Sequence, residues 1–221
     1  MNLARLPWTA VPVDALLVVP LGATEQHGPH LPLGTDTAIA EALAARLAAA
    51  RPDAVVAPAL AYGSSGEHAG FAGTLSIGQA GFELAVTELV RSADGFAATV
   101  LVCAHGGNAA PLARATATLT AEGRRVLAWS PRVPGGDAHA GRTETALMQA
   151  LAPDDVDMSA ARRGDVRPLT ELAADLRAGG VRSVSANGVL GDPDGATAAE
   201  GEQLLDALTA DLVAAVGAWL R

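Results

Sequence analysis

Short runs of leucine and β-branched residues alternate along this chain with longer stretches rich in alanine and leucine. The runs at 15–20, 54–57, 98–103 and 125–129 have the length and continuous apolar character of buried strands. The stretches at 37–50, 81–93, 109–122, 143–151 and 197–220 have the length of helices. Strands that alternate with helices in this way form βαβ units. The sequence therefore predicts an α/β protein with a mainly parallel sheet.

Composition and charge narrow the class of protein further. The length of 221 residues fits one large domain, so we expect a single domain over residues 1–221. The net charge is −9 and every basic residue is arginine, which disfavours nucleic acid or an anionic membrane as the main partner. The only cysteine, Cys103, ends an apolar run and is expected to be a buried, reduced thiol. No signal peptide is recognisable, and we expect a cytoplasmic protein.

The sequence also predicts two local features, a helix cap and an irregular segment. Thr35 or Asp36 is available as the N-cap of the helix that follows the first strand. The segment 160–195 is the most polar and least regular part of the chain, and we expect weak strands and a turn at 191–193 there. The pattern leaves open whether this segment shapes a pocket or an interface.

All five histidines lie in segments that resemble loops, close to glycine or to an acidic residue. These segments are 22–36, 66–70, 104–108 and 137–144. Three of them follow predicted strands, so they should meet at the carboxyl edge of the sheet, where α/β proteins bind ligands. Imidazole nitrogens and carboxylate oxygens together are typical ligands of a borderline divalent metal ion. The leading hypothesis is a metal-dependent amide hydrolase.

Five residues are candidate metal ligands. Glu25 and His27 are one residue apart, a spacing that directs both side chains to the same side of an extended segment. Asp36 lies further along the same loop, His105 opens a His-Gly-Gly-Asn turn, and Glu144 begins a helix. With one carboxylate as a bridge, three carboxylates and up to three imidazoles are sufficient for two ions, which would activate a water molecule and polarise a carbonyl group.

Amide hydrolysis also requires a proton donor for the leaving nitrogen. His139 is the first candidate for this role, with Glu67 and His68 as second choices. The backbone N–H groups of Gly106, Gly107 and Asn108 are candidates to stabilise the oxyanion. Trp129, at the end of a strand, is a candidate for the pocket wall, although packing in the core is an equal alternative.

Each candidate also has an ordinary structural explanation. Residues 22–36 would then be a solvated polar loop, and His105 would belong to a helix-capping turn. Glu144 would be a first-turn acid that the helix dipole stabilises, and His139 would only orient a ligand. His30 is expected to be structural or to support a neighbouring ligand. Glu67 and His68 are expected to lie in a surface loop as readily as at a substrate or a subunit contact.

The loop at 22–36, with the sequence GATEQHGPHLPLGTD, resembles the signature of the creatininase (creatinine amidohydrolase) family. The resemblance continues through 66–68, 105–108, 139–145 and 188–193, in the order of that family. It implies a three-layer α/β/α domain, two metal ions (zinc, manganese or iron) and a homo-oligomer, often a hexamer. It further implies that Glu25 and His105 bind one ion and His27 the other, with Asp36 as the bridge. Glu144 would then complete the second ion, and His139 would carry the proton.

The chain departs from creatininase itself at one ligand position. Creatininase has a metal-binding glutamate two residues after the equivalent of His105, where this chain has Gly107. Creatinine is therefore a poor expectation for the substrate. The short chain and the segment Tyr62–Phe71 most resemble the branch of the family that acts in mycofactocin biosynthesis. That resemblance implies a peptidase that releases the C-terminal Val-Tyr dipeptide from a modified precursor peptide.

Two alternatives remain. One is a deformylase or cyclic amidase of the same family, acting on a small amide such as a formylated heterocycle. The other is a non-catalytic scaffold stabilised by metal, which a single cysteine and an excess of carboxylates disfavour, since structural zinc sites are usually rich in cysteine.

Overall fold

The computed structural model describes residues 1–221 and contains one sheet of four parallel strands. The strands are β1 (Leu16–Leu21), β2 (Ala54–Val56), β3 (Ala98–Cys103) and β4 (Val126–Trp129), in the spatial order β2-β1-β3-β4. Val18 in β1 lies between Val56 of β2 and Val100 of β3. Every residue of β1 and β3 is buried, which explains their uninterrupted apolar sequences.

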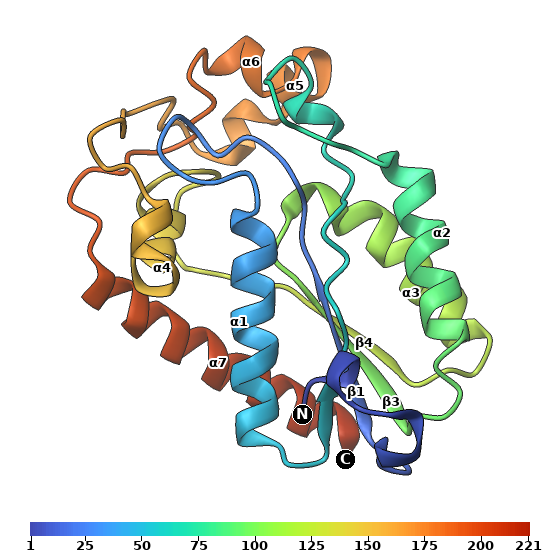
Figure 1. Cartoon of the computed structure of the whole chain (residues 1–221). Helices are drawn as coiled ribbons and strands as arrows, with labels where there is room; N and C mark the ends of the chain where they lie inside the picture. The colour runs from blue at the N-terminus through green and yellow to red at the C-terminus, as the bar shows by residue number, and fades with distance from the viewer.

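Helices cover both faces of the sheet, as Figure 1 shows. Helices α1, α4 and α7 contact one another on one face, whereas α2 and α3 pack together on the other. Their bounds are α1 Thr35–Ala50, α2 Gly78–Arg91, α3 Ala109–Ala121, α4 Arg142–Leu151 and α7 Ala198–Leu220. The predicted parallel α/β fold with three layers is confirmed. The four strands of the sheet and these five helices lie within a few residues of their expected bounds.

The two faces of the sheet form two separate cores. Leu16 and Val18 pack with α1, α4 and α7, whereas Leu17 and Val19 pack with α2 and α3. This division follows from the alternation of side chains along a strand. Cys103 is buried in the second core, as expected for a reduced thiol. Each fully buried aliphatic side chain in these two cores contributes about 1.5–3 kcal/mol to stability.

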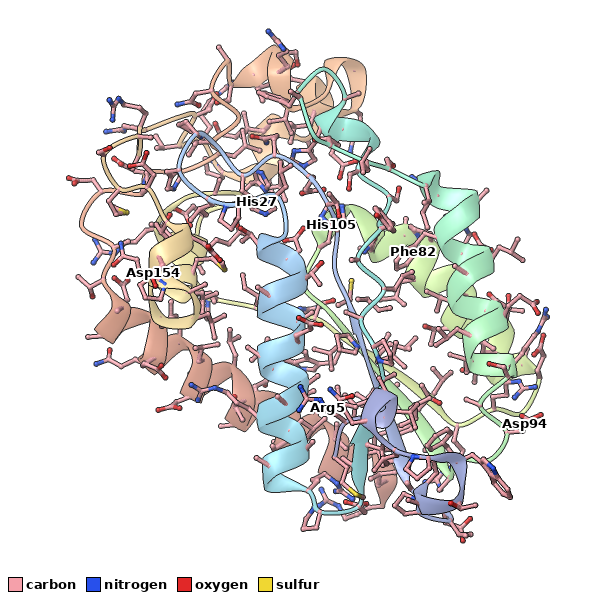
Figure 2. The ribbon with its side chains drawn as sticks, in the orientation of Figure 1. Arg5, His27, Phe82, Asp94, His105 and Asp154 are labelled. Carbon is pink, nitrogen blue, oxygen red and sulfur yellow. The ribbon has the colours of Figure 1, made fainter.

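The order of the strands determines where a ligand can bind. The chain passes from β1 to β2 on one side and then returns to β3 on the other side of β1. Such a reversal opens a crevice outside the carboxyl ends of the two central strands. The loops that follow β1 and β3 begin at this crevice. In Figure 2, His27 and His105 lie at this end of the sheet, and Arg5 and Asp94 lie at the opposite end.

Residues 160–195 contain helices, so the prediction of weak strands there was wrong. Helix α5 spans Leu169–Gly179 and α6 spans Val181–Val184. Strand-like pairing in this segment is limited to an isolated bridge between Leu190 and His139. Leu172, Val181 and Leu190 form a small third core. Both helices contact the 3-10 helix η3 (Gly66–His68) and lie above the carboxyl edge of the sheet (Figure 1).

The starts of two helices show different capping. Helix α1 begins at Thr35 with Gly34 as its N-cap, so the expectation of Thr35 or Asp36 in that position was wrong. Thr35 instead donates its hydroxyl to the Pro32 carbonyl, at 2.8 Å. Helix α7 has a side-chain cap, because the Thr197 hydroxyl accepts a hydrogen bond from the Glu200 N–H at 3.2 Å.

Helix α7 is long and apolar enough to cross a membrane by length and composition, although 22% of its most apolar window is buried in the protein. Its buried residues recur every three or four positions and pack against the sheet and its neighbouring helices. They are Gly201, Leu205, Leu208, Leu212 and Val216. This spacing is typical of a helix that covers a protein core.

Candidate metal centre

The loop after β1 folds back on itself and buries its polar side chains. The Glu25 N–H donates to the Leu33 carbonyl at 3.0 Å, and His27 forms a bridge with Leu31. Gly28 permits this reversal with a φ of 66°, in the left-handed region that favours glycine. The side chains of Glu25 and His27 are both fully buried as a result. Burial of such groups is costly unless they have partners, so the loop is not a solvated surface loop.

Asp36 lies in the first turn of α1, with its carboxylate between two histidines. Its Oδ1 is 3.3 Å from His27 Nε2, and its Oδ2 is 3.3 Å from His105 Nδ1. His105 Nε2 lies 3.2 Å from Glu25 Oε2. The loop after β1, the start of α1 and the turn after β3 therefore converge on one small volume.

Glu144 reaches the same volume from the first turn of α4. Its Oε2 accepts a hydrogen bond from the Ala140 N–H at 2.6 Å and lies 3.9 Å from His27 Nε2. The side chain is 21% exposed, which makes Glu144 the most accessible acid of the five predicted ligands. His30 Nε2 lies 2.9 Å from the Thr145 hydroxyl, so His30 anchors the start of α4 and has the expected structural role.

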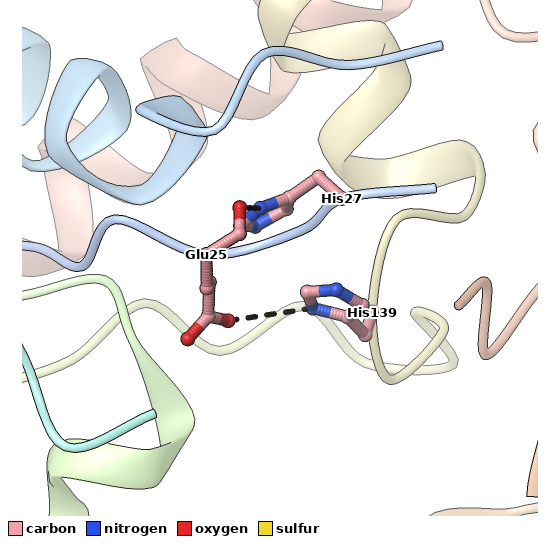
Figure 3. Close-up of side chains that lie close together, drawn as sticks. All are labelled: Glu25, His27 and His139. Carbon is pink, nitrogen blue, oxygen red and sulfur yellow. Dashed lines mark hydrogen bonds and ion pairs between the residues drawn. The ribbon is translucent and has the colours of Figure 1, made fainter. Parts of the chain in front are cut away.

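The five predicted ligands form two overlapping groups. Glu25, Asp36 and His105 form one group, and His27, Asp36 and Glu144 form the other, with the ligand atoms of each group within 4.8 Å of one another. Asp36 belongs to both groups, as a bridging carboxylate would. His139 forms a third group with Glu25 and His27, and Figure 3 shows the Glu25 carboxylate directed toward the His139 ring.

The cluster contains carboxylate oxygens without hydrogen-bond partners and a free ring nitrogen, which are suitable ligands for a metal ion. Both carboxylate oxygens of Glu25 and the Oδ2 of Asp36 are buried without a hydrogen-bond partner, although buried polar atoms nearly always have one. His27 Nδ1 lies 3.1 Å from the Glu25 carbonyl, which only accepts, so Nε2 is the nitrogen free to bind a metal ion (Figure 3). This donor set suits zinc, manganese or iron.

The pKa values of the clustered side chains also favour a bound cation. Burial lowers the pKa of His27, but Asp36 and Glu144 outweigh burial and raise it to about 9. Burial also opposes protonation of His105, yet Asp36 and Glu25 raise its pKa well above the usual value. Burial raises the pKa of Asp36, but His27 and His105 bring it well below its ordinary value. The cluster therefore favours positive charge, which a proton or a metal ion can supply.

A cavity of about 730 Å³ opens directly beside the cluster. Glu25, His105 and His139 lie in its wall, and Leu176 and Arg177 of α5 also line it. The volume is within the range of sites for small molecules and short peptides, about 300–1,000 Å³. The polar segment at 160–195 therefore shapes this cavity.

The three predicted catalytic side chains all line this cavity. His68 Nε2 lies 3.1 Å from Glu25 Oε1, and His139 Nδ1 lies 3.9 Å from the same oxygen. Burial lowers the pKa of His68 to about 4, and burial together with His27 and His68 lowers the pKa of His139 well below its usual value. Burial therefore disfavours the charged form of both rings.

Glu67 approaches the cluster through the space beside Gly107. Its Oε1 is 3.7 Å from His105 Nε2, and burial raises its pKa. A Cβ atom at Gly107 would overlap the Glu67 carboxylate, the His105 ring and the Ser64 carbonyl. The glycine at position 107 thus allows an acid from another loop to lie next to His105.

Two of the sequence expectations require correction. Trp129 does not line the cavity; it packs in the core, and its indole N–H donates to Asp211 at 2.8 Å. Asn108 does not offer a free N–H, because its backbone N–H donates to the His105 carbonyl at 3.3 Å. Its side chain ties two loops together by accepting from the Ser64 N–H and donating to the Gly22 carbonyl, at 2.8 and 3.0 Å. Gly106 and Gly107 do line the cavity.

Sequence reasoning also missed a residue. Gln26 is 5% exposed, and its amide contacts both His68 and His139. Its position between Glu25 and His27 was the available signal.

Comparison with known proteins agrees with this geometry. The sequence profile of the creatininase family, described as creatinine amidohydrolase, matches residues 7–216. The chain belongs to the creatininase family. It is 52% identical to the mycofactocin precursor peptide peptidase of Mycolicibacterium smegmatis over 196 residues, covering 86% of this chain and 79% of the relative. It is 49% identical to the protein of that name from Mycobacterium tuberculosis over 215 residues, covering 92% and 85%.

Solved structures of this family resemble the fold across its whole length. A structure named "Creatininase Mn" superposes with a TM-score of 0.75 at 26% identity and covers 97% of this chain and 96% of its own. A creatininase variant of the zinc–zinc type gives a TM-score of 0.74 at 26% identity, with the same coverage. The protein is thus an amidohydrolase of a metal-dependent family, with a buried cluster of metal-binding residues beside its cavity.

Proposed function

We propose that this protein is a peptidase that releases the C-terminal Val-Tyr dipeptide from the modified precursor peptide of mycofactocin, with two divalent metal ions per chain. The observation that carries the proposal is the set of buried, unpartnered carboxylate oxygens beside a cavity of about 730 Å³. The relatives named as precursor peptide peptidases support the choice of substrate.

We assign five residues to the ions. Glu25, Asp36 and His105 would hold one ion, and His27, Asp36 and Glu144 would hold the other, because their ligand atoms form two groups that share Asp36. Zinc, iron and manganese all suit these nitrogen and oxygen donors. Bound ions of this kind lower the pKa of a water molecule to about 7 and polarise the carbonyl that the water attacks.

The remaining polar groups would move the proton and stabilise the developing charge. His139 lines the cavity and its Nδ1 lies 3.9 Å from Glu25 Oε1, so we assign it to take up a proton and pass it to the leaving nitrogen. Glu67 and His68 line the same cavity and are the second candidates for proton transfer. Gly106 and Gly107 also line it, and their N–H groups are candidates for oxyanion contacts.

Mass spectrometry after incubation with the modified precursor peptide tests this function. The expected result is a shortened peptide together with a released dipeptide that carries the valine and tyrosine. A chemically synthesised peptide without the modification serves as the control for specificity. An unchanged precursor, together with turnover of a formylated heterocycle, would refute the peptidase and favour a deformylase.

The family resemblance supports a proposal on assembly, and the single cysteine supports one on location. We propose a homo-oligomer, with a hexamer as the expected form, and a cytoplasmic enzyme. Light scattering coupled to size-exclusion chromatography would measure the mass, and a monomer of 22.1 kDa would contradict the assembly.

A further inference from the structure

Gln26 holds a fixed amide orientation inside the cluster of histidines. Its Oε1 accepts a hydrogen bond from the Gly28 N–H at 2.9 Å, and its Nε2 donates to the Gly188 carbonyl at 3.1 Å. A rotated amide would place two donors together at Gly28 and two acceptors together at Gly188. The positions of the amide oxygen and nitrogen are therefore determined by the backbone.

One proton of the amide remains, and two histidine nitrogens lie within its reach. His68 Nδ1 is 2.9 Å and His139 Nε2 is 3.0 Å from Gln26 Nε2. His139 Nε2 also lies 2.8 Å from the backbone carbonyl of Gln26, which can only accept. His139 Nε2 therefore carries a proton and cannot accept another, so the remaining amide proton goes to His68 Nδ1.

These contacts determine what each ring offers to the cluster. An imidazole ring that accepts at one nitrogen carries its proton on the other, so His68, which accepts at Nδ1, is protonated at Nε2. That nitrogen lies 3.1 Å from Glu25 Oε1. His139 is protonated at Nε2 and turns its unprotonated Nδ1 toward the same oxygen, at 3.9 Å. Both rings are in the wall of the cavity, but they offer opposite hydrogen-bonding groups.

We propose that Gln26 is a positioning residue that gives His68 and His139 these opposite roles. Its side-chain amide makes His68 a hydrogen-bond donor at Nε2, and its backbone carbonyl makes His139 an acceptor at Nδ1. This inference rests on the proposed function for its catalytic meaning, in which His139 takes up a proton and His68 donates a hydrogen bond to the substrate.

Nuclear magnetic resonance of zinc-loaded protein with ¹⁵N-labelled histidine measures the position of each ring proton directly. In the wild type, both His68 and His139 should carry their proton on Nε2. Gln26→Glu replaces the amide donor with an acceptor, so the His68 proton should move to Nδ1. His139 should be unchanged, because the backbone carbonyl of residue 26 remains. Gln79→Glu makes the same chemical change in the cavity wall without a histidine contact, and it should leave both rings unchanged.

Kinetics give the second readout. Gln26→Glu should lower kcat by about 10- to 100-fold, as loss of an orienting partner commonly does, while KM and metal content stay near those of the wild type. Gln26→Met is the second variant, for use if the glutamate variant fails to fold. It removes the donor without adding charge and should give mixed protonation of His68.

Two results would overturn the inference: a wild-type His68 protonated at Nδ1, or a His68 that keeps its Nε2 proton in both folded variants. A wild-type protein with the expected ring protons but no release of dipeptide would refute the proposed function and leave the positioning of the rings intact.

Discussion

Replacement of Gly107 by alanine tests whether the space beside His105 is as tightly filled as the structure shows. The added Cβ would lie closer than 3.0 Å to three atoms, which belong to Glu67, His105 and Ser64. The Glu67 carboxylate ends a flexible side chain and can move away. The Ser64 carbonyl cannot, because the Ser64 N–H is bound to Asn108 at 2.8 Å. The His105 ring, held between Glu25 and Asp36, must therefore shift.

The size of the effect follows from these contacts. Overfilling a packed site costs about 1–3 kcal/mol. For a protein of this length, that loss lowers the Tm by about 2–12 °C. A displaced His105 should also weaken metal binding, by about 10- to 100-fold if the loss is similar to that of an orienting partner.

The assay is calorimetric unfolding of the metal-loaded protein, together with titration of the metal-free protein with zinc. Gly106→Ala is the matched control, because no atom lies within 4 Å of the Cβ position at Gly106. That control should stay within about 0.5 kcal/mol of the wild type. Neither glycine has a positive φ, so backbone strain does not separate the two variants. If Gly107→Ala matched Gly106→Ala in both Tm and zinc affinity, the reasoning about this space would be refuted.

Further predictions concern the cluster and one helix cap. Asp36→Ala should remove both metal and activity, since Asp36 belongs to both ligand groups. His139→Ala should retain metal and lose turnover. Equal metal loss from the two variants in elemental analysis would show that the roles are assigned wrongly. Removal of metal by a chelator should lower the Tm, because buried carboxylates then lose the cation that offsets their charge, and added zinc should restore it in calorimetry. Thr197→Ala should cost about 0.5–2 kcal/mol in chemical denaturation through loss of the cap of α7, with metal content unchanged. A stability equal to that of the wild type would show that this cap contributes nothing.

The sequence predicted the sheet and most of the helices because the hydrophobic pattern of each element is local. The run Ala98–Cys103 was predicted with the bounds that β3 has, since a strand buried on both faces is apolar throughout. The same logic failed for α5, where Leu169, Leu172 and Leu176 have helical spacing within a polar segment. The polar composition of the segment concealed that spacing. The assignment of residues 1–221 to a single domain stays a prediction.

The candidate ligands were also visible in the sequence, because glycine and proline frame acids and histidines in loops that follow strands. Glu25, His27, Asp36, His105 and Glu144 are all brought together by the fold. Residue types and spacing indicated the acids and histidines of the cluster, and the family resemblance separated the five ligands from His139.

Other features were decided by the tertiary structure alone. The core position of Trp129 depends on Asp211 of α7, 82 residues further along the chain. The hydrogen bond from His139 Nε2 to the Gln26 backbone carbonyl spans 113 residues. The space that Glu67 fills beside His105 exists because residue 107 lacks a side chain. Such contacts form only because the order of the strands places distant loops at one edge of the sheet. The hydrophobic pattern within a single segment contains no information about that order.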